Sequence, residues 1–297
     1  MMDDSFIKYI IENPRKIVKL EFSEIQKILN KARKILENEN LVLNLNIKEE
    51  EGFYYVIGDI HGNLNSLLYF IDKINTSKPE KVVFLGDIVD RGLNQLECLI
   101  LVLIMKIISP RQIFLIRGNH ETLEMNRAYG FYQEFVNKFY HYEWFNEILS
   151  IYDALPICAK LDQSILCVHG GIPKDFSILN KLDKIKTRDS NSIYKEGEDA
   201  LFQMMWNDPK EDLRGFSQSY RGTGIYFFGK DVFNDFLKEN KFNFLIRSHE
   251  CFPEGFRWFF NKKLLSIFSS ANYRGSNPAS FAIIKNHQIL PENIANL

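Results

Sequence analysis

Polar side chains that could bind metal or phosphate follow five short apolar runs in this sequence. Runs 53–57, 81–85 and 112–116 end in Gly-Asp-Ile-His-Gly, Gly-Asp-Ile-Val-Asp-Arg-Gly and Arg-Gly-Asn-His-Glu, and runs 165–168 and 244–246 end in His-Gly-Gly and Arg-Ser-His. The glycines let the backbone turn sharply beside functional groups. Together these turns supply nine residues: Asp59, His61, Asp87, Asp90, Arg91, Asn119, His120, His169 and His249.

Four of the six histidines stand at these run ends, whereas His141 and His287 lie elsewhere. Any one of the four, taken alone, is more often a hydrogen-bonded core residue than a ligand, but their joint placement beside carboxylates favours a site. Imidazole, carboxylate and amide ligands without thiolate suit catalytic Mn, Fe, Co or Zn. If six of these nine side chains act as ligands, they exceed what one ion with an open position can use. Two ions about 3.5–4 Å apart, sharing one carboxylate, would use them all for an in-line displacement at phosphorus. Asp87, between the two sets, is the bridging candidate.

The elements that position these residues follow from hydrophobic periodicity. Ser23 and Gln26 form a capping box before apolar residues at helical spacing through Leu36, and period-two alternation from 41 to 47 predicts a strand. Segments 64–74 and 96–108 are long and apolar enough for helices. Together with the first three apolar runs they give a β-α-β-α-β order. This order predicts a largely parallel sheet with its ligand site at the strand ends.

Beyond Leu155 the apolar runs become shorter and more closely spaced. Runs at 165–168, 244–246, 256–260, 264–268 and 280–284 are typical of strands in an antiparallel sheet, with one helix at 231–239. No repeat or Pro/Ser-rich linker separates the two halves. We therefore expect one catalytic domain over 1–297, with the helix and strand of 1–48 packed on it.

Composition excludes several classes of protein. The chain has 297 residues, of which 45% are hydrophobic and 25% charged, which is the average of globular proteins. Its 37 basic and 38 acidic residues give a net charge of −1, so no bulk field attracts nucleic acid or a membrane surface.

Location in the cell is predicted from the amino terminus and the cysteines. Asp3 and Asp4 stand where a secretory signal carries basic residues, and the longest apolar run, 98–105, is too short for a membrane span and predicts a buried helix. The four cysteines (Cys98, Cys158, Cys167 and Cys251) form no Cys-x-x-Cys motif and have no even spacing. We expect reduced core cysteines in a cytoplasmic protein.

The four motifs Gly58–Gly62, Gly86–Gly92, Arg117–Glu121 and His169–Gly171, in this order and spacing, closely resemble the signature of the phosphoprotein phosphatase family of metal-dependent Ser/Thr phosphatases. The resemblance extends to about Lys285 through Trp206-Asn207-Asp208-Pro209, Arg221-Gly222, Phe228-Gly229 and Ser270-Ala271-Asn272-Tyr273, which favours the eukaryotic type 1, type 2A and calcineurin branch, including compact archaeal or prokaryotic members. It implies an α/β fold: a metallophosphoesterase-like central β-sandwich flanked by helices, with the active site at strand carboxyl ends.

The resemblance also implies a role for each site residue. Asp59, His61 and Asp87 would hold one metal, and Asp87, Asn119, His169 and His249 the other, with manganese expected and iron, zinc or cobalt as alternatives. A hydroxide activated by both metals would attack phosphoserine or phosphothreonine of protein substrates without a phosphoenzyme. His120 would be the general acid, oriented by Asp90. Arg91 and Arg221 would bind phosphoryl oxygens, and Tyr273 would contact substrate. For Asp208, which precedes a proline, two roles stay open: it helps to hold these arginines, or it only forms a turn.

Three departures from the family pattern lie on the substrate-facing rim. Ala271 replaces a usual proline, Arg274 follows Tyr273 where cysteine is frequent, and Glu250 follows His249 where glutamine is more common. These changes bear on substrate preference and leave the expected ligands intact. Two alternatives remain: a dinucleoside polyphosphate hydrolase of the same superfamily, and a non-catalytic scaffold that binds phosphoproteins.

Overall fold

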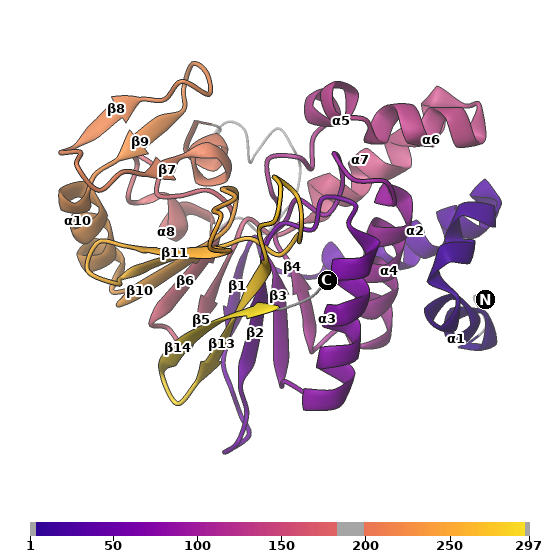
Figure 1. The fold of residues 1–297 in the computed structure, drawn as a ribbon, viewed down its shortest axis with the longest axis horizontal. Helices are drawn as coiled ribbons and strands as arrows, with labels where there is room; N and C mark the ends of the chain where they lie inside the picture. The colour runs from indigo at the N-terminus through magenta and orange to yellow at the C-terminus, as the bar shows by residue number, and fades with distance from the viewer. Residues whose placement is uncertain (1–3, 183–198, 295–297) are drawn as a thin grey trace.

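Two β-sheets packed face to face form the centre of the computed structural model, which describes residues 4–182 and 199–294 (Figure 1). One sheet has the order β14-β13-β2-β3-β4, the other β1-β5-β6-β10-β12-β11, and a small third sheet has the order β7-β9-β8. The strands are β1 Val42–Leu45, β2 Tyr54–Ile57, β3 Lys81–Phe84, β4 Ile113–Leu115, β5 Cys158–Leu161, β6 Ile165–Val168, β7 Asp208–Pro209, β8 Phe216–Gln218, β9 Tyr226–Phe228, β10 Phe244–Arg247, β11 Phe256–Phe259, β12 Leu264–Ile267, β13 Ala279–Lys285 and β14 Gln288–Ile294.

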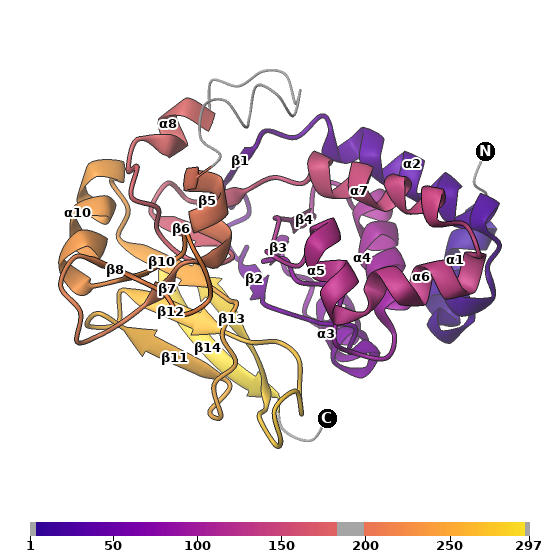
Figure 2. The same ribbon diagram turned by 90° about the horizontal axis from the view of Figure 1, so that it is seen from above.

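Helices cover the outer face of each sheet, giving four layers (Figures 1 and 2). Helices α2, α3, α4 and α7 lie on the side of the five-stranded sheet, and α8 and α10 lie on the other side. Residues 199–206 are also helical. The labelled helices are α1 Asp4–Glu12, η1 Pro14–Lys19, α2 Phe22–Leu36, α3 Leu64–Ser77, α4 Gln95–Ile108, α5 Leu123–Tyr129, α6 Phe131–Phe139, η2 Tyr142–Trp144, α7 Phe145–Ala154, α8 Ile178–Leu182 and α10 Lys230–Asn240.

Alternating side chains along each strand fill different layers. In β2, Tyr54 and Val56 point between the sheets, while Tyr55 and Ile57 pack against the helices. Both faces of the strands are thus buried, which explains their nearly continuous apolar sequences. The central sandwich flanked by helices and the helix and strand positions of the amino-terminal half agree with the expectation from sequence.

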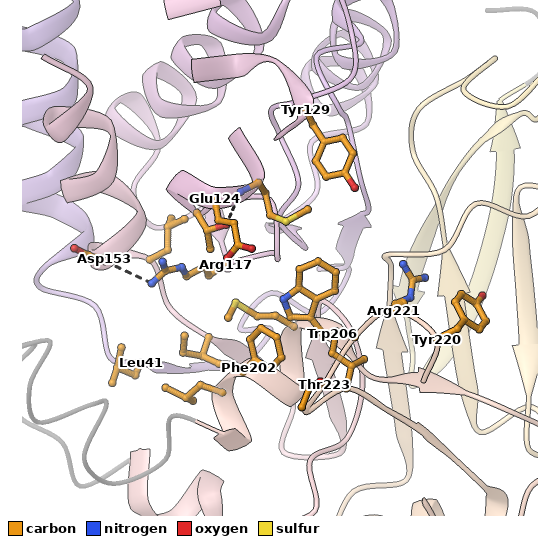
Figure 3. A pocket seen from close by; sticks show the side chains of 18 residues that line it. Leu41, Arg117, Glu124, Tyr129, Asp153, Phe202, Trp206, Tyr220, Arg221 and Thr223 are labelled. Atoms are coloured by element: carbon orange, nitrogen blue, oxygen red, sulfur yellow. Dashed lines mark hydrogen bonds and ion pairs between the residues drawn. The ribbon is translucent and has the colours of Figure 1, made fainter. Parts of the chain in front are cut away.

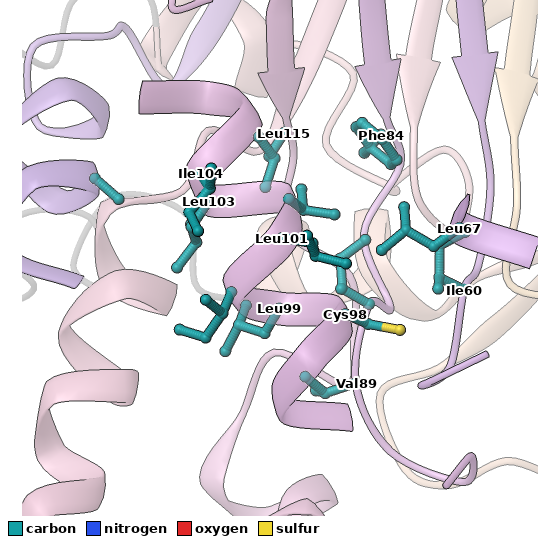
Figure 4. Packing of buried hydrophobic residues seen from close by; sticks show 14 of the residues in the cluster. Ile60, Leu67, Phe84, Val89, Cys98, Leu99, Leu101, Leu103, Ile104 and Leu115 are labelled. Carbon is teal, nitrogen blue, oxygen red and sulfur yellow. The ribbon is translucent and has the colours of Figure 1, made fainter. Parts of the chain in front are cut away.

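The expected buried helix over 98–105 lies within α4, which is apolar on almost all sides (Figure 4). Leu99, Leu101 and Ile104 contribute to the largest apolar cluster, together with Phe84 of β3. No helix in the described ranges has the length and hydrophobicity to cross a membrane. Asp3, on which part of the expectation for the amino terminus rested, lies outside the described residues.

The expected strand directions are correct in the first half and wrong in part of the second. Strands β2, β3 and β4 are parallel neighbours. Among the five runs expected to form antiparallel sheet, β6, β10 and β12 instead run parallel to one another. The expected antiparallel pairing is found for β11 with β12, and for the run 280–284 in β13, which pairs with β2 and β14 of the other sheet. The long crossover between β6 and β10 contains α10, so it returns the chain to the same end of the sheet. The parallel pair is what brings His169 and His249 together.

The capping box expected at Ser23 and Gln26 is wrong by two residues. Helix α2 begins at Phe22, and the reciprocal pair is Glu21 and Glu24, with the Glu21 N–H donating to Glu24 Oε2 at 2.9 Å. The ring of Phe22 is buried and stacks on Trp144 with 4.0 Å between centroids. Because the helix already begins at Phe22, Ser23 lies inside its first turn.

The buried carboxyl group of Glu134 on α6 predicts that the stability of the fold depends on pH. Its carboxylate accepts hydrogen bonds from the Leu96 N–H at 3.0 Å and Gln95 Nε2 at 2.7 Å. Burial, with Glu97 nearby, raises the pKa of Glu134 to about 7. The folded state therefore keeps a proton that the unfolded chain releases near its ordinary pKa of about 4.3, so the free energy of unfolding falls as pH rises from about 4.5 to about 7.

We expect Glu134→Gln to remove this pH dependence. Between pH 5 and pH 8 the wild type should lose about 2 kcal/mol more than the variant, measured by urea denaturation. Glu143→Gln, at an exposed position, is the control and should behave like the wild type. Equal losses in wild type and Glu134→Gln would contradict the assignment.

Candidate active site

The turns that follow β2, β3 and β4 of one sheet meet the turns that follow β6 and β10 of the other. This junction brings together all six sequence-predicted metal ligands. Asp59, His61, Asp87, Asn119 and His169 are at most 4% exposed, and the side chain of His249 is 3% exposed. The expected site at the carboxyl ends of the strands therefore agrees with the structure.

The first ligand group surrounds Nε2 of His61. The Nδ1 atom of His61 lies 2.9 Å from the Val89 carbonyl oxygen, which can only accept, so Nδ1 carries the proton and Nε2 faces the site. This Nε2 lies 3.5 Å from Asp59 Oδ2 and 3.6 Å from Asp87 Oδ2.

The second ligand group surrounds Nε2 of His169 in the same manner. Nδ1 of His169 donates to the Leu85 carbonyl at 2.8 Å. Its Nε2 lies 2.8 Å from Asn119 Oδ1, 3.2 Å from His249 Nδ1 and 3.4 Å from Asp87 Oδ2. The same oxygen of Asp87 thus belongs to both groups, while its Oδ1 accepts the His120 N–H at 2.9 Å.

This donor set fits divalent cations. Asp59 Oδ2 and His249 Nε2 are buried without a hydrogen-bond partner in the described structure. Burial lowers the pKa of His61, but Asp59 and Asp87 outweigh it and raise that pKa to about 9, which means that the two carboxylates favour positive charge at this position. Burial and the nearby Arg221 and His169 hold the pKa of His249 well below its ordinary value, so this imidazole is neutral, the form that binds metal. Lone pairs and carboxylate oxygens that converge in this way require positive charge between them.

The turns that carry these residues have strained backbone conformations. His61, Asp87, Asp90, Arg91 and His249 all have left-handed backbones, with φ between 48° and 74°. Such conformations each cost on the order of 1 kcal/mol for residues other than glycine and cluster at functional sites. Gly118 allows the turns to approach closely, because a Cβ there would lie 2.3 Å from Asp87 Oδ1.

Two supporting residues were not predicted from the sequence. Glu121 is buried, and its carboxylate accepts the N–H groups of Asp87 at 2.8 Å, Ile88 at 3.0 Å and Gly118 at 2.8 Å. Ser248 accepts the Asp59 N–H at 2.9 Å and donates to the Asp59 carboxylate. Both stand within motifs noted above, directly beside His120 and His249, but only the fold shows that they fix the two carboxylates.

His120 lies beside the first ligand group but has a different partner. Its Nδ1 lies 2.7 Å from Asp90 Oδ2, and Nε2 lies 4.0 Å from Asp87 Oδ2. Asp90 is fully buried and also accepts hydrogen bonds from Asn126 Nδ2 at 2.9 Å and the Phe131 N–H at 3.1 Å. The ring is therefore oriented through Nδ1, which leaves Nε2 directed toward the site.

Both predicted phosphate-binding arginines line the site. The guanidinium of Arg91 lies 3.6 Å from the ring centroid of Tyr129, and Arg221 Nε pairs with Asp208 Oδ2. The other oxygen of Asp208 pairs with the buried Arg247 at 2.8 Å. Of the two roles left open for Asp208, the structure therefore favours holding Arg221, although its second partner is Arg247 and not Arg91.

Tyr273 forms part of the wall of the candidate active site. Its ring stacks on His61 with 5.1 Å between centroids, and burial raises its pKa to about 12, so the hydroxyl stays protonated. Three of the four cysteines, Cys98, Cys158 and Cys167, are buried thiols, as expected. Cys251, however, is half-buried at the site and is not a core residue, because it follows His249 at the end of the β10 turn.

A catalytic cavity of about 150 Å³ lies over these groups, lined by Asp87, Asn119, His120, Arg221 and Tyr273 among others. It opens onto a larger groove of about 880 Å³ (Figure 3). Trp206 and Tyr129 line both spaces, and in the groove Arg117 pairs with Asp153 at 3.6 Å. A phosphoryl group fits the cavity, and a longer chain attached to it has room outside.

Residues 54–253 match the calcineurin-like phosphoesterase family, which covers all six residues of the two ligand groups. The chain belongs to this family. It is 37% identical over 238 residues to the serine/threonine-protein phosphatase 6 catalytic subunit of Caenorhabditis elegans, covering 79% of this chain and 70% of the relative. It is 36% identical over 279 residues to a protein phosphatase 2A catalytic subunit of Dictyostelium discoideum, covering 92% of this chain and 85% of that relative.

Solved structures agree with this assignment. A protein serine/threonine phosphatase from Saccharomyces cerevisiae with similarity to human phosphatase PP5 superposes with a TM-score of 0.82 at 27% identity, covering 94% of this chain and 91% of the relative. The family resemblance and the α/β fold inferred from the motifs are confirmed.

Proposed function

We propose that this calcineurin-like phosphoesterase is a metal-dependent serine/threonine protein phosphatase that hydrolyses phosphoserine and phosphothreonine in proteins without a phosphoenzyme intermediate. One observation carries the proposal: a single oxygen of Asp87 belongs to two groups of ligands, with the His120–Asp90 pair directly beside them. The named relatives, which are protein phosphatase catalytic subunits, support the substrate class.

The metal ligands in this proposal are those expected from the motifs. Asp59, His61 and Asp87 would hold one divalent ion, and Asp87, Asn119, His169 and His249 the other, with manganese as the expected metal. When bound, the ions would lower the pKa of an attacking water and polarise the phosphoryl oxygens. Glu121 and Ser248 would keep the carboxylates of Asp87 and Asp59 in place, since they fix the backbone or the carboxylate itself.

His120 would protonate the departing serine or threonine oxygen. Asp90 accepts a hydrogen bond from Nδ1 of His120, so Nε2 would be left to donate toward the cavity. Because Asp90 is fixed by two further hydrogen bonds, it would orient the ring and stabilise the positive charge.

Arg91 and Arg221 would bind the phosphoryl oxygens. Planar guanidinium groups can pair with two oxygens at once, and both line the catalytic cavity. Tyr129 and Asp208 hold them in position before the substrate arrives. Tyr273, which stacks on His61, would contact the substrate from the loop before β13.

We also propose that 1–297 acts as one catalytic domain. Residues 1–48 would belong to it, because within the described part α2 packs on α4 and α7 and β1 pairs with β5. Phosphoproteins are the proposed partners, without nucleic acid or membrane, and the cytoplasmic location stays a prediction.

Comparing two substrates tests the proposed function. With Mn²⁺ present, we expect turnover of a phosphoserine peptide and little turnover of a dinucleoside tetraphosphate. The reverse preference would indicate a nucleotide hydrolase, and binding of the phosphopeptide without turnover would indicate a scaffold. Either result would overturn the proposal.

A further inference from the structure

A second groove, with a different chemical character, opens from the catalytic cavity. It has a volume of about 620 Å³ and lies between residues 61–65 before and at the start of α3, 91–94 before α4, and 270–274 before β13. We call it the cationic groove. The residues that line it include Arg91 and Arg274, four asparagines and no aspartate or glutamate. Of the residues that line it, His61, Arg91 and Tyr273 have roles assigned above at the catalytic cavity, and the rest of the groove has none.

The groove is continuous with the catalytic cavity. His61, Arg91, Tyr273 and Arg274 line both spaces. A peptide whose phosphorylated side chain occupies the cavity therefore has a path for its neighbouring residues. At about 3.3 Å per residue, three extended residues span about 10 Å, which places nearby side chains within reach of these arginines.

The walls of the groove are fixed before any ligand binds. Asn63 Nδ2 donates to the Ala271 carbonyl at 2.9 Å, which joins the first and third loops. The Asn94 N–H donates to the Gly62 carbonyl at 3.1 Å, which joins the first and second. A preformed groove reduces the ordering cost of binding.

Positive charge in the groove has no partner of opposite sign within the described chain. No carboxylate among the described residues lies within 4.0 Å of the guanidinium of Arg91 or Arg274, and their side-chain contacts are with tyrosine rings. Arg274 is exposed, and its backbone N–H is held by Asn277 Oδ1 at 2.9 Å, so its side chain is available at the rim. Arg15 extends the charge, because its Nη2 binds Asn65 Oδ1 at 2.9 Å.

We propose that the cationic groove selects protein substrates with an acidic residue within about three positions of the phosphorylated residue, and that Arg274 is the main specificity-determining side chain. This inference rests on the proposed phosphatase function. Arg91 is already assigned to the phosphoryl group, so Arg274 is the cation at the cavity rim that remains for a second negative charge. The pair that it forms would be exposed, so its effect is moderate and depends on salt.

The test uses peptides with one phosphoserine and Glu, Ala or Lys at each of three positions on either side. We expect Glu at one or more of these positions to raise kcat/KM about fivefold over Ala at low salt, and the preference to shrink at high salt. Arg274→Glu should reverse the preference at the same position in favour of Lys, and Arg274→Lys should retain it. Arg111→Ala is the matched control, since Arg111 is exposed near the opposite, amino end of β4.

Each outcome either supports or overturns the proposal for the cationic groove. Equal kcat/KM for Glu and Ala peptides at all positions would overturn the groove proposal while leaving the phosphatase function intact. An Arg274→Glu variant that slows every peptide by the same factor would assign Arg274 to phosphoryl binding and would also overturn it. If no phosphopeptide is hydrolysed, the proposed function fails and the groove proposal fails with it.

Discussion

His120→Asn should retain both metal ions and lose about 10²–10⁴-fold of kcat on a phosphoserine peptide, the typical contribution of a positioned general acid. A serine alkoxide is a poor leaving group and needs the proton that Nε2 of His120 would supply. With p-nitrophenyl phosphate the loss should be much smaller, because its leaving group departs with little protonation. The difference between the two substrates is therefore the diagnostic quantity, measured by steady-state kinetics at saturating metal.

Two companion variants sharpen this prediction. Asp90→Asn should lower kcat in the same substrate-dependent direction, since Asp90 orients His120 through the 2.7 Å contact. His141→Asn, which changes an exposed histidine beside Trp144, should leave both substrates unaffected. Loss of metal from His120→Asn, or an equal loss on both substrates, would show that His120 is a ligand or an electrostatic binder.

The site could be predicted from sequence because local and global signals coincide there. Each of Asp59, Asp87 and Asn119 follows a buried run and a sharp turn, and neighbouring parallel strands present their carboxyl ends at one edge. The same logic located His169 and His249 at the ends of β6 and β10.

Strand direction in the second sheet could not be predicted in this way. Strands such as β6 and β12 are four residues long and buried on both faces, so their sequences show no alternation that would reveal their neighbours. Their direction depends on how the intervening segments cross the sheet, which is a property of the whole fold.

The contacts that support the site residues could not be predicted from the sequence pattern either. Glu121 acts through three backbone N–H groups in two different turns, and such a role leaves no spacing rule. The pairing of Asp208 with Arg247 joins residues 39 positions apart. By contrast, Arg274 was expected on the rim from its place after Tyr273, and the structure places it there.

The proposed metal centre gives a second prediction with a large effect. Chelation should abolish phosphoserine hydrolysis, because the six proposed ligands, Asp87 and the five side chains around it, cannot organise the reaction without positive charge between them. His249→Ala should weaken one ion more than the other, since His249 belongs to only one of the two ligand groups. Equal loss of both ions with the fold intact would require a different partition of ligands.

Metal content and phosphoserine peptide hydrolysis, measured on the same protein through chelation and stepwise reloading with Mn²⁺, test the proposal of a binuclear phosphatase most directly. We expect no activity without metal and recovery that is complete at two bound ions per chain. Undiminished hydrolysis in a metal-free preparation would contradict it.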